Sequence, residues 1–548
     1  MKGNHLHVAV GGEMTQLRSV VIIGSGPAAA GAALALLEDP GVTITIIDLG
    51  LRLEEEHEAA RRRLAQIDES SWRGEDLAVI QHQPVAIGNS RLPQKRTYGS
   101  DFPFRDLGQQ QGLPEFKGHV DPVVSGAYGG FSNVWGAQTM PFSRATFDCW
   151  PLSYDDLAPH YKVALDEMHV SGDDDDLANL FPHIAPPIPL PPLSARTNAV
   201  LGNYERNRAA LGLRGLTLGR ARVALNSTAC TRCGLCMTGC PNELIYSSSQ
   251  TFDRLRATGR VNYRPGLMAL KLAEDEQGPL VRVKSIESSM VEDLRADRIF
   301  VACGGLGSTR LVLGSLEETS HRLEFLESAQ FLIPALSLHP VGDPEIDRDF
   351  TLNQFNMVYD DSGIGLDLVQ VHFYPNNPAV ERGFPSFVQS AAFAGLRSST
   401  LKRLSVGLGY LPSWASPTAT LTARATGINS LPDLELERKN PKIFPPMLRR
   451  FLSAMLKSGA QLDLWPVLPM VTLSDVTKSY HFGGTFPMSN ERGGYRTDVL
   501  GRLDRWEKIH LIDGSVFPSI PATTFTLTVM ANAHRIAKAV CRQEKTSK

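Results

Sequence analysis

The glycine-rich turn after the first apolar run constrains the fold of this chain more than any other feature. Residues 18–24 are mostly apolar and lead into Gly24-Ser-Gly26-Pro-Ala-Ala29, a G-x-G-x-x-A pattern that opens an alanine-rich helical stretch. In such a strand–turn–helix unit the first glycine permits the tight turn and the second lets a pyrophosphate approach the backbone, while the alanine allows close packing of helix on strand. We predict that Gly24, Gly26 and Ala29 bind a dinucleotide; the alternative is a glycine turn without a ligand.

A second β-branched run, at residues 42–47, ends in Asp48. An acidic residue at this place accepts hydrogen bonds from the adenosine ribose hydroxyls and disfavours a 2′-phosphate. Residues 298–313 predict another buried strand and helix, and a strand at 509–512 precedes a helix at about 524–541. The dinucleotide-binding fold is therefore expected to begin near residue 18 and to be completed at the C-terminus.

The composition is that of an ordinary globular chain. Of 548 residues, 42% are hydrophobic and 21% are charged, and the formal net charge is −3. No basic block dominates any segment, which argues against a nucleic-acid partner. No apolar stretch approaches the roughly 20 residues of a transmembrane helix, and residues 1–16 lack the pattern of a secretory signal. We expect a cytoplasmic protein without a transmembrane segment and with residues 1–17 as a flexible tail.

Four further segments decide which dinucleotide is expected. They are Tyr128–Gly136 (YGGFSNVWG), Ala302–Ser308 (ACGGLGS), His481–Met488 (HFGGTFPM) and Ile512–Pro518 (IDGSVFP). In this order they resemble the glucose–methanol–choline (GMC) family of flavin oxidoreductases, which implies FAD as the cofactor. The resemblance covers about the first 150 residues, residues 220–315 and about the last 70. Residues 320–470 match the family only by their position in the chain.

The resemblance implies an α/β fold (α+β overall), in which a Rossmann-like FAD-binding domain carries an inserted substrate domain. The expected FAD-binding domain comprises residues 18–150, 215–320 and 476–545, and the substrate-binding domain comprises 151–214 and 321–475. Short alternating runs between residues 330 and 425, such as 366–374 and 418–424, predict a mainly antiparallel sheet in the substrate domain.

The resemblance also assigns cofactor contacts to three other sets of residues. One set resembles the loop that passes under the flavin and its pyrophosphate: Gly129, Gly130, Ser132 and Asn133. Asp513 and Gly514 resemble the motif at the ribityl and pyrophosphate region, and Thr528 falls near the isoalloxazine. Glycines in the loop admit close approach of the backbone to a ligand.

The resemblance implies two catalytic residues, His481 and Thr524, and His481 is the predicted base because it occupies the place of the family's catalytic histidine. Imidazole has a pKa near working pH and can take the alcohol proton while hydride leaves the same carbon. The family has a second His or Asn in the closing segment, where this chain has Thr524. Threonine hydrogen-bonds but is no comparable base, so either His481 is the sole base or the substrate hydroxyl is held differently.

A run of cysteines forms a second chemical signature. Its spacing, C-x2-C-x2-C-x3-C-P, is that of bacterial ferredoxins, and its cysteines are Cys230, Cys233, Cys236 and Cys240. Some flavin dehydrogenases that resemble this chain hold a three-iron cluster on cysteines spaced like the first, third and fourth. We predict an iron–sulfur cluster (3Fe-4S or 4Fe-4S), with a metal-free loop and a zinc site as the alternatives.

These features together predict an FAD-dependent dehydrogenase. It would oxidise a CH–OH group of a sugar-like or other small-molecule substrate by hydride transfer to flavin. Electrons would pass through the cysteine site to an electron-acceptor protein or small carrier. The alternatives are a flavin oxidase, a flavin-dependent isomerase or lyase without net electron export, and a flavin-binding relay without turnover.

Overall fold

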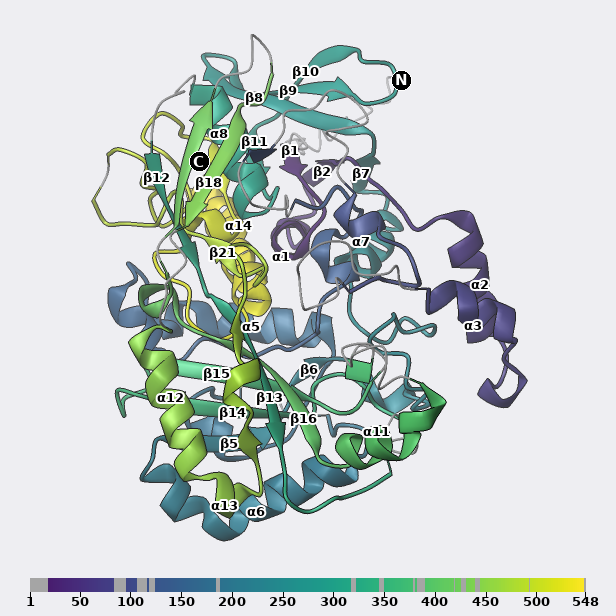
Figure 1. Ribbon diagram of the computed structural model, residues 1–548. Coiled ribbons are helices and arrows are strands. Elements are labelled where there is room, and N and C mark those ends of the chain that lie inside the picture. Colours follow the sequence, from purple (N-terminus) through teal and green to yellow (C-terminus); the bar gives the residue numbers. More distant parts are fainter. Residues whose placement is uncertain are drawn as a thin grey trace, which may run out of the picture.

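The structure is a computed structural model that has two halves, one above the other in Figure 1. It describes residues 18–82, 95–105, 116–117, 124–183, 188–316, 322–343, 349–377, 380–381, 390–417, 419–424, 430–438, 444–491 and 493–546. The predicted tail at residues 1–17 lies outside these ranges.

A five-stranded parallel sheet forms the centre of the upper half. Its strands, in spatial order, are β22 (Ile509–Leu511), β11 (Arg298–Val301), β1 (Arg18–Ile23), β2 (Val42–Ile47) and β7 (Val261–Arg264). Buried β-branched residues fill these strands, as expected for a parallel sheet covered on both faces. The central strand β1 runs into α1 (Pro27–Leu36), so the predicted strand–turn–helix unit is present.

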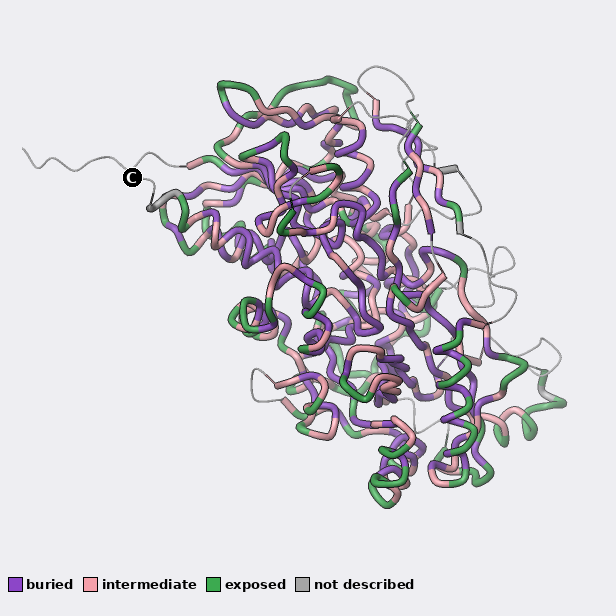
Figure 2. Tube along the Cα trace, turned by 90° about the vertical axis from the view of Figure 1, so that its left-hand side faces the viewer, coloured by how far each residue is buried: buried purple, intermediate pink, exposed green. Residues whose placement is uncertain are grey.

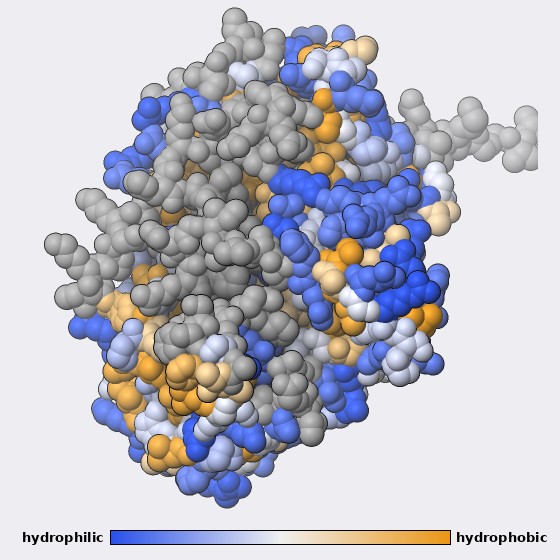
Figure 3. Space-filling view, turned by 45° about the vertical axis from the view of Figure 1, so that its right-hand side comes forward, coloured by the Kyte–Doolittle hydropathy of each residue, from blue (hydrophilic) through white to orange (hydrophobic). Residues whose placement is uncertain are grey.

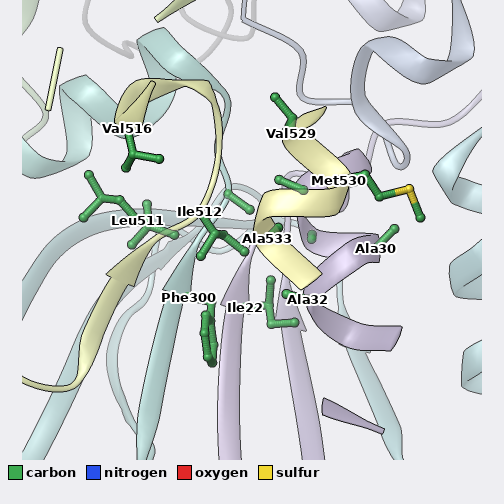
Figure 4. Packing of buried hydrophobic residues seen from close by; sticks show 14 of the residues in the cluster. Ile22, Ala30, Ala32, Phe300, Leu511, Ile512, Val516, Val529, Met530 and Ala533 are labelled. Atoms are coloured by element: carbon green, nitrogen blue, oxygen red, sulfur yellow. The ribbon is translucent and has the colours of Figure 1, made fainter. Parts of the chain in front are cut away.

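The C-terminal helix closes this half by packing on the first helix of the chain. Figure 4 shows α14 (Thr526–Thr546) beside α1, over side chains from β1, β11 and β22. A Cβ atom at Gly31 would lie 2.2 Å from the carbonyl oxygen of Met530. The two helices therefore approach each other closely because residue 31 has no side chain.

Other elements surround the parallel sheet. A three-stranded antiparallel sheet, of β8 (Leu267–Asp275), β9 (Gly278–Ser285) and β10 (Val291–Arg295), packs near α8 (Gly305–Leu316). The remaining elements of this part are the helices α2 (Glu55–Ala65), α3 (Gly74–Ile80), α5 (Tyr154–Met168) and α7 (Ser248–Arg256), and the strand pair β4 (Val170–Ser171) and β6 (Val223–Ala224).

A seven-stranded sheet forms the lower half. Its main path is β19 (Trp465–Pro466), β13 (Gln330–Leu336), β16 (Leu404–Tyr410), β15 (Leu368–Tyr374), β14 (Phe355–Asp360) and β5 (Leu216–Arg220), and β20 (Thr472–Leu473) also pairs with β13. One face of this sheet packs on α6 (Ala195–Gly212) and α12 (Pro446–Lys457) in a shared apolar cluster. Two shorter helices, α11 (Ala394–Leu401) and α13 (Gly459–Leu462), complete this half.

The inserted region contains two sheets where one was predicted. The second sheet has the order β21 (Phe482–Gly483), β12 (Arg322–Glu327), β17 (Ala419–Arg424), β18 (Asp433–Arg438) and β3 (Phe116–Lys117). The alternating runs at 368–374 and 419–424 are both strands, but they belong to different sheets. Alternation specifies a strand and its faces, but it does not specify its neighbours. The predicted domain boundaries stay predictions.

Figure 2 shows that buried segments run through both halves of the molecule. On the face shown in Figure 3, hydrophobic side chains gather in the lower part of the view. Exposed large hydrophobic residues of the lower half include Leu338, Leu396 and Met470. In the part of the chain that the structure describes, we find no helix long and apolar enough to cross a membrane.

Candidate active site

The turn after β1 has the geometry that the sequence predicts for a nucleotide-binding loop. Gly24 has a φ of +103°, and a Cβ there would lie 2.5 Å from the Ala302 carbonyl oxygen on the neighbouring strand. A Cβ at Gly26, in contrast, would have no atom within 4 Å. Within the described chain no side chain caps the N-terminus of α1, which starts here. A backbone that is open to close approach at a helix N-terminus suits a pyrophosphate.

Asp48 lies at the end of β2, beside this turn. Its carboxylate accepts hydrogen bonds from the Ser25 hydroxyl and from the backbone N–H of Gly50, the latter at 3.3 Å. Burial raises the pKa of Asp48 to about 7. The Ser25 hydroxyl in turn accepts from the N–H of Gly129 at 2.9 Å, so this carboxylate is linked to the predicted flavin loop. The place and chemistry of Asp48 fit a partner of ribose hydroxyls.

The predicted flavin loop lies directly against the first turn. Gly129 and Gly130 have φ values of +95° and +58°, and a Cβ at Gly130 would lie 3.5 Å from the Cα of Gly26. Ser132 donates to the Gly129 carbonyl at 2.5 Å and accepts from the N–H of Ser248 at 2.9 Å. The Ser132 hydroxyl therefore links the predicted flavin loop to the N-terminus of α7.

Asn133 has a similar internal role. Its amide donates to the carbonyls of Tyr128 and Gly130 at 2.9 and 2.8 Å, and it accepts from the Ser247 hydroxyl at 3.1 Å. Both polar residues of the loop therefore fix its shape, and their contact with FAD stays a prediction.

The C-terminal motif is held next to the histidine segment. Asp513 accepts from the N–H of Ser515 at 3.0 Å and from the Ser308 hydroxyl, and burial raises its pKa. The carbonyl of Gly514 accepts from the N–H of Gly484 at 2.9 Å. A Cβ at Gly483 would lie 2.0 Å from that carbonyl oxygen. The glycines of HFGG therefore allow the two segments to lie in contact.

His481 is buried at the junction of this segment with the seven-stranded sheet. Its ring stacks on Tyr410, with centroids 4.7 Å apart, and meets the edge of Phe525 at 5.2 Å. Burial lowers the pKa of His481 to about 3. The predicted pKa near working pH is wrong for this reason: burial away from water disfavours the imidazolium. The ring is neutral at pH 7, and among the described residues its Nδ1 has no hydrogen-bond partner.

The backbone around His481 is fixed by a buried carboxylate. The Ser479 hydroxyl accepts from the N–H of His481 at 3.1 Å and donates to Glu327 at 2.8 Å. Glu327 also accepts from the N–H of Thr477 at 2.7 Å. These hydrogen bonds fix the backbone of His481, and they leave its Nδ1 without a hydrogen-bond partner among the described residues.

The hydroxyl groups of Thr524 and Thr528 form hydrogen bonds within the protein. Thr524 donates to the carbonyl of Gln138 at 2.9 Å, and Thr528 shares a hydrogen bond of 2.9 Å with the Tyr161 hydroxyl on α5. Thr524 therefore anchors the end of the flavin loop to the closing segment. The catalytic role of Thr524 stays a prediction.

The C-terminal part of the chain is the part that sequence comparison recognises. A family model described as GMC oxidoreductase matches residues 466–533. Residues 466–533 are therefore similar to the C-terminal part of the GMC oxidoreductases. His481, Asp513, Gly514, Thr524 and Thr528 all lie within the matched segment. No curated protein sequence matches the chain.

Solved structures share the whole fold. Pyridoxine 4-oxidase from Mesorbium loti matches at 15% identity and a TM-score of 0.57, over 96% of this chain and 99% of that one. A formate oxidase matches at 15% identity and a TM-score of 0.59, over 97% and 100%. At such identities the likeness concerns the fold. The predicted α/β class with a sheet-rich second domain is confirmed, and family model and fold together support an FAD-dependent oxidoreductase.

The cysteine loop gives no support to the predicted cluster. Cys236 is buried. The negative charge of its thiolate form would raise the pKa of Cys230, Cys233 and Cys240, because these three cysteines lie near it. Burial raises the pKa of Cys233 to about 12 and that of Cys240 to about 11. Thiols suit iron or zinc, but in the described ranges no three His, Cys, Asp or Glu side chains stand close enough to hold a metal. The structure therefore gives no evidence for a cluster, and the cluster stays a prediction.

A short segment joins the cysteine loop to the flavin loop. Lys95 and Thr97 donate to the carbonyls of Trp135 and Asn133, at 2.6 Å each. The backbone N–H of Tyr98 donates to the Thr238 carbonyl at 2.6 Å, and its hydroxyl donates to the Cys240 carbonyl at 2.8 Å. The two loops are thus fixed to one another although about 100 residues separate them.

Sequence reasoning missed the part of the site contributed by the seven-stranded sheet. Tyr410 stacks on His481, and His372 lies beside Tyr410, while Gln370 is buried opposite Tyr410 on the neighbouring strand. These strands are the ones for which the family resemblance was weakest. One signal could have found them. Polar residues alternate with Val369, Val371 and Phe373 in β15, which is unusual for a strand that is buried throughout.

Proposed function

We propose that this protein oxidises a CH–OH group of a small molecule with FAD as the electron acceptor. The observation that carries the proposal is the buried imidazole of His481, which lies within the segment that matches the GMC model and stacks on Tyr410 of the seven-stranded sheet. Among the described residues its Nδ1 has no hydrogen-bond partner. A neutral imidazole is the form that accepts a proton. The turn after β1 and the loop near Gly130, where we expect FAD to bind, lie against each other, since a Cβ at Gly130 would lie 3.5 Å from the Cα of Gly26.

The protein has three tasks in this reaction. His481 accepts the hydroxyl proton as the carbon–oxygen double bond forms and the C–H hydride departs. The stack with Tyr410 and the anchored backbone at Ser479 hold the ring in one orientation. Bound FAD supplies the hydride acceptor. Burial of the site excludes water and strengthens each hydrogen bond to the reacting group.

We further propose that a separate protein or small carrier takes the electrons from the reduced enzyme. The test compares turnover with oxygen and with an artificial acceptor such as ferricyanide. A dehydrogenase turns over faster with the acceptor and forms little peroxide. Turnover at full rate with oxygen alone, with one peroxide per substrate, would reject the carrier.

An oxidase is the second candidate, because both structural relatives named above are oxidases. In that case oxygen takes two electrons and two protons to form hydrogen peroxide. An isomerase or lyase would instead leave the flavin oxidised after anaerobic turnover. Complete anaerobic bleaching of the flavin by substrate excludes that alternative.

The iron–sulfur prediction has its own test and no step above depends on it. Iron and acid-labile sulfide are measured on anaerobically purified protein, together with its EPR spectrum. Three or four irons per chain would support a cluster. Iron-free protein in which all four thiols of the loop react after unfolding would reject it.

A variant experiment tests the proposed base. His481→Gln should retain bound FAD and lose about 100-fold or more in the rate of flavin reduction, as is typical when a general base is removed. His339→Gln is the control, because His339 is an exposed side chain of the lower half. Flavin reduction at the wild-type rate in His481→Gln would reject the assignment.

A further inference from the structure

Lys95 is a positively charged residue beside the predicted flavin loop, and the reaction proposed above does not use it. The residue is partly buried, and its Nζ donates a hydrogen bond to the carbonyl of Trp135 at 2.6 Å. An ammonium group has three donors, and among the described residues the Trp135 carbonyl is its one acceptor. The charge of Lys95 therefore lies against the loop with most of its donors unused by the described protein.

No carboxylate of the described chain neutralises this charge. Burial lowers the pKa of Lys95 to about 8, and among the described residues only a thiolate at Cys236 would raise it again. The ammonium form therefore still predominates at pH 7. A charge that is partly removed from water is stabilised by an opposite charge nearby. An anion that binds from outside the chain would supply this opposite charge.

The predicted flavin loop runs from the pyrophosphate turn toward the proposed base. At its start, a Cβ at Gly130 would lie 3.5 Å from the Cα of Gly26. Beyond its end, the carbonyl of Gln138 accepts a hydrogen bond from Thr524 at 2.9 Å. The aromatic ring of the residue after Thr524 lies 5.2 Å from the ring of His481. One end of the loop therefore lies at the dinucleotide turn, and the other lies beside the base.

The contact of Lys95 belongs to the end beside the base. Trp135, which accepts its hydrogen bond, stands three residues before Gln138 in the sequence. At the next residue, Gly136, a Cβ would lie 3.0 Å from the hydroxyl of Tyr374 on the seven-stranded sheet. Lys95 therefore adjoins the part of the loop where the isoalloxazine is expected, and not the part where the pyrophosphate is expected.

The proposed reaction creates a negative charge at that end of the cofactor. The substrate carbon gives up a hydride, which is two electrons and one proton, and the hydroxyl proton passes to His481. Bound FAD that has received a hydride carries one more negative charge than oxidised FAD. A cation that is already in place stabilises such a charge in the transition state and in the product, at no cost of reorganisation.

We propose that the ammonium group of Lys95 supplies the positive charge that stabilises reduced, anionic FAD and so raises the reduction potential of the cofactor. Charge near the flavin ring is one of the means by which a protein tunes the electronic properties of this cofactor. The inference deepens the proposed function and rests on the expected binding of FAD. Removing the charge should make bound FAD harder to reduce without releasing it.

A set of variants at two adjacent residues separates charge from shape. Lys95→Met removes the charge and keeps a long side chain, whereas Lys95→Arg keeps the charge. Arg96→Gln is the matched control, because Arg96 is the neighbouring cation and already pairs with Asp101 at 3.6 Å. FAD content and Tm are measured first for each protein. Lys95→Gln, whose amide can still donate to the Trp135 carbonyl, replaces Lys95→Met if that variant loses FAD.

The reduction potential of the bound flavin is the readout, and it requires no substrate. Each protein is reduced with dithionite under anaerobic conditions beside a reference dye, and both absorbances are followed at equilibrium. We expect the equilibrium in Lys95→Met to shift about 10-fold toward oxidised FAD, which is about 30 mV for a two-electron couple. Lys95→Arg and Arg96→Gln should stay within about 3-fold of wild type.

Four results overturn the inference. The first is a Lys95→Met potential equal to that of wild type, and the second is an equal shift in Lys95→Met and Arg96→Gln. The third is an equal shift in Lys95→Arg and Lys95→Met, which would show that shape matters and charge does not. The fourth is loss of FAD from both Lys95→Met and Lys95→Gln, which would assign Lys95 to binding of the oxidised cofactor.

Failure of the proposed function gives a different result. In that case the wild-type protein binds no FAD, or no alcohol reduces the FAD that it binds. A bound flavin whose potential is the same in wild type and in Lys95→Met rejects the role of Lys95 alone.

Discussion

The imidazole of His481 lies on the phenol ring of Tyr410, with centroids 4.7 Å apart and an angle of 30° between the ring planes. The two residues come from different parts of the chain and meet where the histidine segment adjoins the seven-stranded sheet. The Tyr410 hydroxyl accepts a hydrogen bond from Gln330 at 3.0 Å, which fixes the phenol ring. The proposed base therefore depends on the substrate half for its orientation.

Replacing Tyr410 tests this support. Tyr410→Ala removes the surface on which the imidazole lies, and we expect kcat to fall about 10-fold or more because a misplaced base loses proton-transfer efficiency. Tyr410→Phe keeps the ring and should stay within about 3-fold of wild type, since only a hydrogen bond to Gln330 is lost. Equal kcat values for the two variants, at equal FAD content, would contradict the positioning role.

The buried histidines predict how stability depends on pH. Burial lowers the pKa of His372 and of His481 to about 3 each, whereas an unfolded histidine has a pKa of about 6.5. Below about pH 6.5 the unfolded chain binds protons that the folded chain does not, so stability falls as the pH falls toward 3. Above that pH these two residues add no pH dependence.

His372→Gln should therefore flatten the pH profile. The slope of unfolding free energy between pH 6 and pH 4 should decrease by up to about 1.4 kcal/mol per pH unit. Urea unfolding at several pH values measures this slope, with the exposed His339→Gln as the control. An unchanged slope in His372→Gln would show that this histidine is not buried as described.

The contact of α14 with α1 predicts a strong effect at Gly31. Gly31→Ala would place a Cβ 2.2 Å from the Met530 carbonyl, so we expect a loss of about 3 kcal/mol in unfolding free energy or a failure to fold. Gly395→Ala is the control, because a Cβ at this helical position meets no atom within 4 Å. It should be neutral or stabilising by up to about 1 kcal/mol. Similar Tm values for both variants would contradict the close helix contact.

Asp48 predicts a selective effect on the cofactor. Asp48→Ala should purify with less FAD than wild type, and added FAD should bind about 10-fold more weakly, because two hydroxyl partners are lost. Asp297→Ala removes another carboxylate of this half, which accepts from the backbone of Ser19 at 2.9 Å, and should retain FAD. FAD content is measured by flavin released per chain. Full FAD occupancy in Asp48→Ala would reject the ribose assignment.

The fold of the nucleotide half could be predicted because local rules specify it. Gly24, Gly26 and Ala29 set the turn and the helix contact, and the β-branched runs at 18–23 and 42–47 form adjacent parallel strands. The same logic located the strand at 509–511 and the last helix. Each of these features is readable within about 30 residues of sequence.

The sheet-borne part of the site could not be predicted in this way. Gln330, Gln370 and Tyr410 are neighbours only because β13, β15 and β16 pair in a particular register. Strand partners are chosen by long-range packing, which no local pattern encodes. The pKa of His481 was missed for the same reason, since it depends on burial by distant residues.

The most direct test of the central claim is anaerobic reduction of the bound flavin by a panel of alcohols, in wild type and in His481→Gln, followed by rapid mixing. The account predicts that the best alcohol bleaches the wild-type flavin completely and that His481→Gln, with equal FAD content, is slower by about 100-fold or more. Equal rates in the two proteins, or a wild-type flavin that no alcohol bleaches, would contradict it.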